Sequence, residues 1–68
     1  MQYIKLELQY LKDRLKICED YIKSLKELSE KYGKSIDITE QLIFANGQKY
    51  EIEKMIEHFK FTLQLIGD

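Results

Sequence analysis

The sequence has few of the residues that stabilise small proteins or carry out catalysis in them. Among its 68 residues there is one cysteine, one histidine, no proline and no tryptophan. A single cysteine excludes a disulfide within the chain, and a single histidine leaves little for a structural metal site. Because so short a chain buries only about 60% of its unfolded surface, we expect oligomerisation to supply the missing stability.

A strong charge of either sign is also missing. The formal net charge is −1, so the basic excess that is typical of nucleic-acid-binding proteins is absent. Residues 1–34 carry eight basic and six acidic side chains, whereas residues 35–68 carry three basic and six acidic ones. The two halves should therefore attract each other weakly when they fold together.

No run of about 18 apolar residues occurs, so the sequence predicts no membrane-spanning segment. Lys5 and Glu7 lie where a signal peptide would need its apolar core. Without a targeting segment, a lone cysteine suits a reducing compartment, and we expect a cytoplasmic location. The length and the Lys, Ile and Glu bias are typical of small bacterial, phage or mobile-element proteins.

Apolar residues in the first half follow a heptad, alternately four and three positions apart, which is typical of a coiled coil. The positions of this seam are Ile4, Leu8, Leu11, Leu15, Cys18, Ile22, Leu25, Ser29 and Tyr32. They predict a helix over about 3–32. Gly33 should end it, because glycine accepts the left-handed conformation that follows a helix.

A loop over about 33–38 and a second helix over about 39–66 should follow. Asp37 and Glu40 could form a capping box, and Thr39 could instead be the cap, flanked by a hydrophobic staple. The sequence does not decide between these two starts. The seam of the second helix is Leu42, Ala45, Lys49, Ile52, Ile56, Phe59, Leu63 and Ile66.

Asn46-Gly47 interrupts this second pattern with a strong turn signal. The chain either turns there or continues as a helix, at a cost of about 1 kcal/mol for the glycine. Leu42 and Ala45 keep the same phase as Ile52 and Ile56, and no alternating strand pattern flanks the pair. We therefore expect one continuous helix, with Gly67 as its stop.

These features predict an all-α fold, a single antiparallel two-helix hairpin over residues 1–68 that dimerises into a four-helix bundle. One hairpin covers only the two seams, and so much apolar surface left in water is unusual for a monomer. The predicted protein-binding residues are Tyr3, Tyr10, Ile17, Tyr21, Leu28, Ile43, Gly47, Tyr50 and Phe61.

Catalytic, cofactor-binding and metal-binding patterns are not found. A di-iron bundle needs Glu three residues before His, but Met55 stands three before His58. Cys18 falls on the seam in the middle of a helix, where a cysteine packs as a small apolar residue. The three glycines are scattered and form no phosphate-binding loop. We expect no enzyme, no metal and no cofactor.

Gly47 shares one stripe of the second helix with Ile43, Tyr50 and Phe61, and it leaves a notch between large side chains. The notch could be a close helix crossing inside the oligomer, a docking groove for another protein, or a simple tolerated kink. The crossing inside the oligomer is the interpretation that we favour.

The sequence thus predicts a non-enzymatic helical protein–protein interaction module. It would associate with itself and bind another protein, as a phage or mobile-element accessory protein that modulates a host protein would. The alternative is a nucleic-acid-associated regulator that uses lysines of the first helix on a dimer, although interleaved acidic residues make nucleic acid the less favoured partner. Membranes are not expected partners, because neither helix concentrates basic residues on its polar side.

Overall fold

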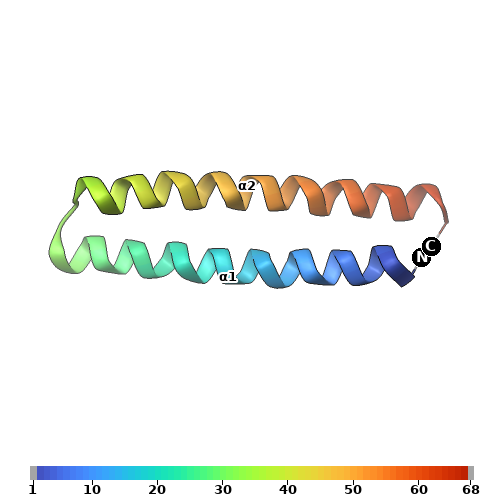
Figure 1. Ribbon diagram of the computed structural model, residues 1–68, viewed down its shortest axis with the longest axis horizontal. Helices are drawn as coiled ribbons and strands as arrows, with labels where there is room; N and C mark the ends of the chain where they lie inside the picture. The colour runs from blue at the N-terminus through green and yellow to red at the C-terminus, as the bar shows by residue number, and fades with distance from the viewer. Residues whose placement is uncertain (1, 68) are drawn as a thin grey trace.

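Two long helices make up the structure, a computed structural model that describes residues 2–67. Helix α1 spans Gln2–Tyr32 and helix α2 spans Ile36–Leu65. They run antiparallel and side by side, so that the start of α1 and the end of α2 lie at the same end of the hairpin (Figure 1). The predicted all-α hairpin is confirmed, and its extents of 50 × 14 × 13 Å leave room for a single layer of core side chains.

The turn between the helices is shorter than the sequence predicted. Gly33 has a φ of 84°, the left-handed conformation expected at the end of α1. The predicted loop over 33–38 is wrong, because α2 already begins at Ile36 and Ser35 is its N-cap. The Ser35 hydroxyl accepts a hydrogen bond from the Ile38 amide at 3.1 Å, which satisfies a donor that the first turn leaves open.

Both predicted caps for α2 are therefore wrong. Asp37 lies within the first turn, where its charge suits the positive end of the helix dipole. Thr39 donates its backbone amide to the Ser35 carbonyl at 3.0 Å, as an interior helical residue does. The carbonyl of an N-cap accepts the first hydrogen bond of its helix, and here Ser35 is that acceptor, so Ser35 and neither Asp37 nor Thr39 is the cap.

The core lies along the two predicted seams. Its buried members come from both helices and are all apolar: Leu11, Cys18, Ile22, Leu25, Ala45, Ile52 and Ile56. Leu8, Leu15, Leu42 and Phe59 are partly buried against them. The seams fail only at their ends, where Tyr32 and Ile66 are exposed because the helices stop there.

Helix α2 passes through Asn46-Gly47 without a break, as predicted. Gly47 does not have a positive φ, in contrast to Gly33 and Gly67. The Asn46 side chain donates to the Leu42 carbonyl at 2.9 Å, one turn back along the same helix. This bond ties the Asn46 side chain to the backbone of α2. Asn46-Gly47, which often forms a turn, is therefore accommodated within the helix.

Candidate protein-binding surface

One flank of the hairpin carries a large apolar surface that draws on both helices. The hydroxyl of Tyr21 on α1 donates to the side-chain oxygen of Gln41 on α2 at 2.7 Å. Tyr21 also borders one groove with Phe44 and another with Gln48. Counting heptads from these contacts places further exposed side chains of both helices on this flank.

We call this surface the broad face, and its members are Tyr3, Tyr10, Ile17, Tyr21 and Leu28 of α1 with Phe44, Met55 and Leu65 of α2. Their exposed fractions run from 44% for Leu28 to 71% for Leu65. Scattered exposed apolar residues are ordinary on a monomer, but eight large ones along one flank of a single hairpin are more than such scatter provides. The broad face is therefore the main candidate for a binding site.

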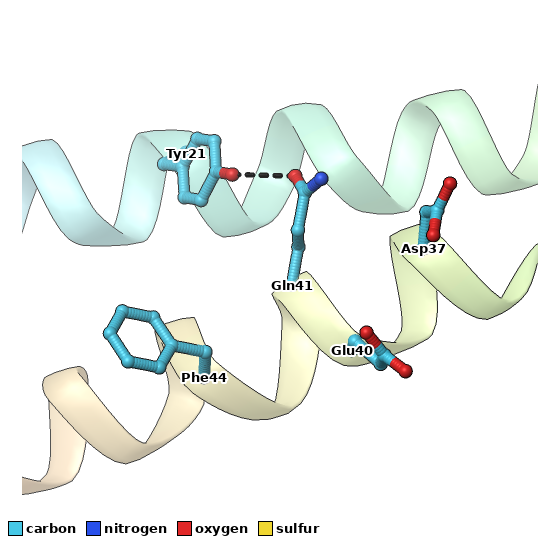
Figure 2. Close-up of a pocket in the computed structure, with 5 residues that line it drawn as sticks. All are labelled: Tyr21, Asp37, Glu40, Gln41 and Phe44. Carbon is cyan, nitrogen blue, oxygen red and sulfur yellow. Dashed lines mark hydrogen bonds between the residues drawn. The ribbon is translucent and has the colours of Figure 1, made fainter.

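Near the turn, the broad face holds a shallow groove of about 410 Å³ between the helices. Figure 2 shows Tyr21 reaching from α1 to Gln41, with Phe44 one turn along α2. Asp37 and Glu40 line the same groove from the first turns of α2. The groove thus has an aromatic part beside Tyr21 and Phe44 and an acidic part beside the two carboxylates.

The nine residues predicted for protein binding do not form one surface. The five from α1 all belong to the broad face. Ile43, Tyr50 and Phe61, with Gly47 among them, lie on other positions of α2, and we call them the narrow stripe. Tyr50 borders a groove with Leu15 and Glu53 on the opposite flank from Tyr21, so the narrow stripe is separate.

Three members of the broad face were missing from the predicted set: Phe44, Met55 and Leu65. The signal that identifies them is their position relative to Ala45, Ile52 and Ile56, the buried residues of α2. They occupy the two heptad positions on the side that also carries Gln41. Exposure alone did not separate them from Ile43 and Tyr50, because all five side chains are exposed.

Gly47 faces open space within the hairpin. A Cβ built on this glycine would find no atom within 4 Å beyond its own helix and chain neighbours. The hairpin therefore contains no close helix crossing at Gly47, and the predicted crossing with a second chain stays a prediction. The Lys54 ammonium lies 5.3 Å from the centre of the Tyr50 ring on this side of α2.

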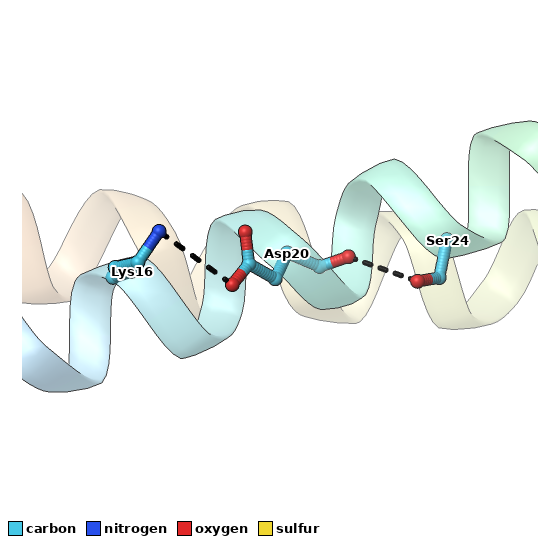
Figure 3. Close-up of polar contacts among 3 residues, drawn as sticks. All are labelled: Lys16, Asp20 and Ser24. Atoms are coloured by element: carbon cyan, nitrogen blue, oxygen red, sulfur yellow. Dashed lines mark hydrogen bonds and ion pairs between the residues drawn. The ribbon is translucent and has the colours of Figure 1, made fainter.

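The polar side of α1 carries exposed charges that pair with neighbours. Figure 3 shows Asp20 between two partners: its carboxylate lies 3.9 Å from the Lys16 ammonium, and its backbone carbonyl accepts from the Ser24 hydroxyl at 3.1 Å. Between the helices, the Lys49 ammonium lies 3.8 Å from the Glu19 carboxylate. Exposed pairs of this kind contribute about 0–1 kcal/mol each, so they orient side chains more than they stabilise the fold.

Cys18 and His58 have the most reactive side chains, and their environments differ. Cys18 is buried in the core as predicted, and its thiol lies 3.3 Å from the Ala45 carbonyl oxygen, to which it donates. His58 is exposed and forms a T-shaped ring contact with Phe59, with 5.9 Å between ring centres. Within residues 2–67 there is no group of three or more His, Cys, Asp or Glu side chains placed to hold a metal ion.

In the part of the chain that the structure describes, neither helix has a stretch long and apolar enough to cross a membrane.

Comparisons of the chain with protein-family models, with characterised proteins and with solved structures find no match.

Proposed function

We propose that this chain is a non-enzymatic protein–protein interaction module that works as a homo-oligomer, with the broad face as its contact surface. The observation that carries the proposal is the row of eight exposed apolar side chains along one flank of the hairpin. The core beneath holds only one layer of side chains. A second copy placed on the broad face would add the layer that a lone hairpin lacks, as in a four-helix bundle.

The small buried core of the hairpin supports the same conclusion. Small domains without disulfides or metals need association or unusually dense packing to remain folded. Here the buried apolar set of the described residues amounts to seven side chains, of which Cys18 and Ala45 are small. Full burial of an exposed isoleucine, leucine, phenylalanine or methionine side chain contributes about 1.5–3 kcal/mol, and the broad face has five of them. Association is therefore a large stabilising term that is open to the chain.

Sedimentation equilibrium of the wild type and Ile17→Glu tests the proposal. Ile17 lies near the middle of the broad face and is 69% exposed in the hairpin, so a charge there harms association rather than the core. The wild type should sediment as a dimer of about twice 8.2 kDa at micromolar concentration, and the variant should shift to the monomer. Lys23→Gln is the matched control, since it changes the net charge equally on the polar side of α1.

Circular dichroism at several protein concentrations completes this test. If monomers unfold when they separate, the helical signal of Ile17→Glu should fall on dilution at concentrations where Lys23→Gln keeps it. A wild type that sediments at 8.2 kDa across the whole micromolar range would overturn the proposal.

The narrow stripe is the surface that we assign to a different protein. Ile43, Tyr50 and Phe61 lie away from the broad face and stay exposed when that face is covered. Aromatic side chains carry much of the binding energy in protein interfaces. Photo-crosslinking from position 50 in the native cell, compared with position 23 on the lysine side, should enrich one protein specifically at position 50; equal labelling from both would contradict this assignment.

A second candidate function rests on the position of the lysines. Heptad counting places these lysines on one side of α1, where Glu19 and Glu30 lie among them and Asp13, Asp20 and Glu27 lie next to them. This lysine side comprises Lys5, Lys12, Lys16, Lys23 and Lys26. If it binds nucleic acid, affinity for generic DNA should fall steeply with salt, because phosphate contacts release counterions. Fluorescence anisotropy that shows no binding at low salt would exclude it.

A further inference from the structure

We propose that the second copy docks in one defined orientation, with the two-fold axis of the dimer parallel to the long axis of the hairpin. In this arrangement α1 of each copy lies over α2 of the other, and Arg14 faces the partner's Glu51. The inference rests on the self-association proposed above and specifies its geometry. We call the position of a residue along the long axis of the hairpin its level, and in this orientation residues at the same level of the two copies meet.

Contacts between the helices fix which residues lie level with one another. Tyr21 borders a groove with Gln41 and Phe44, so these residues share a level near the turn. Arg14 borders a groove with Gln48 and Ile52. Glu51 lies between Gln48 and Ile52 in sequence, so it lies at nearly the same level as Arg14, on the other helix.

Arg14 and Glu51 are exposed side chains of opposite charge near the middle of the broad face. The Arg14 guanidinium lies 5.8 Å from the centre of the Tyr10 ring, which holds it along the face. A two-fold axis along the hairpin preserves every level and exchanges the helices. It therefore sets Arg14 over the partner's Glu51 and Glu51 over the partner's Arg14.

The other symmetric arrangement has its two-fold axis across the hairpin. That axis reverses the levels and places each helix on its own copy, so Glu51, which lies near the midpoint, would meet the partner's Glu51. Like charges that face each other across an interface are strongly unfavourable and select against such a pairing. Charge complementarity thus favours the axis that runs along the hairpin.

The apolar side chains agree with the same orientation. Tyr21 and Phe44 border one groove, so Tyr21 would pack on the partner's Phe44 as an aromatic pair. One turn beyond the Arg14 level, Tyr10 would meet the partner's Met55, a favourable contact between sulfur and ring. The start of α1 and the end of α2 share one end of the hairpin (Figure 1), and there Tyr3 would cover the partner's Leu65.

The area available is close to what a stable dimer buries. A face of 50 by 14 Å spans about 700 Å² before side chains widen it. Standard stable interfaces bury about 800 Å² per partner. A second hairpin of the same length therefore covers the broad face from end to end, and no longer or wider partner is needed.

Charge reversal tests the orientation, with dimer dissociation constants measured by sedimentation equilibrium. Arg14→Glu alone and Glu51→Arg alone should each weaken the dimer by about tenfold or more, because each places like charges opposite one another twice. The double variant should return to within about threefold of the wild type, since the pairs are restored with reversed sign. An equimolar mixture of the two single variants should form a mixed dimer in preference to either homodimer.

Controls come from the opposite flank. Lys23→Glu and Glu53→Arg make the same charge changes on exposed residues away from the broad face and should leave the dissociation constant nearly unchanged. In a dimer with the crosswise axis, a single reversal keeps Glu51 and Arg14 opposite like charges, so the single variants would dimerise as well as the wild type. That result overturns the inferred orientation while the proposed self-association stands, whereas a monomeric wild type removes the proposed function itself.

Discussion

The phenol of Tyr21 joins the two helices through a hydrogen bond of 2.7 Å to the side-chain oxygen of Gln41, while its ring remains nearly half exposed. The polar tip of Tyr21 therefore serves the hairpin, and the ring is available to a partner. Tyr21 therefore lies at the boundary between the core seam and the broad face. It also fixes the relative level of α1 and α2 on that flank.

Tyr21→Phe should separate these two roles. Loss of the hydroxyl removes one exposed hydrogen bond, so the free energy of unfolding should fall by about 0.5–1 kcal/mol. The ring stays, and dimerisation should be retained. Tyr10→Phe, on the same face but without a bond between the helices among the described contacts, is the control. Chemical denaturation and sedimentation equilibrium give the two quantities, and a loss of the dimer in Tyr21→Phe alone would show that the hydroxyl belongs to the interface.

Cys18 should react slowly with thiol reagents in the native protein. Its side chain is 8% exposed, and its thiol lies against the Ala45 carbonyl in the fully buried part of α2. Reaction therefore requires local opening of the hairpin. The labelling rate in buffer should be at least about a hundredfold below that in denaturant, given the free energies of opening that are typical of core positions. Equal rates in both conditions would contradict the packing of α1 on α2.

Ser35→Ala should destabilise the hairpin through the start of α2. The Ser35 hydroxyl accepts from the Ile38 amide, and loss of such a cap costs about 0.5–2 kcal/mol. Thr39→Ala is the matched control at a residue that is already helical, and it should be neutral or slightly stabilising because alanine is the better helix former. Thermal melts of the two variants check this, and the reverse order of stability would place the cap at Thr39.

The sequence predicted the parts of this fold that depend on periodicity. Leu11, Cys18 and Ile22 of α1 and Ile52 and Ile56 of α2 are buried, as the heptads require. A core position needs only its spacing along the chain, and spacing is directly visible in a sequence.

The start of α2 and the division of the surface were not predicted, for physical reasons. Ser35, Asp37 and Thr39 all have side chains that can cap a helix, and the choice depends on the backbone direction after Gly33. Phe44 and Ile43 are neighbours in sequence and equally exposed, yet they belong to different flanks. Separating them requires the side on which α1 packs, which the contact between Tyr21 and Gln41 reveals.

Gly47→Ala is the change that distinguishes the roles of the two apolar surfaces. The glycine is helical, and a methyl group there would meet open space within the hairpin. Alanine should therefore raise the free energy of unfolding by about 0.5–1 kcal/mol, because it restricts the unfolded chain and favours the helix. If the dimer forms through the broad face, Gly47 stays outside the contact, and the gain in melting temperature should be the same at every protein concentration.

The sequence instead favoured a close crossing of two copies at Gly47, in which the added methyl would force the helices apart. That arrangement predicts a loss of stability that grows on dilution. Melts over a hundredfold range of concentration, with Gln64→Ala on the exposed side of α2 as the control, therefore decide which surface of the hairpin joins the copies: a uniform gain assigns this role to the broad face, and a loss on dilution assigns it to the narrow stripe.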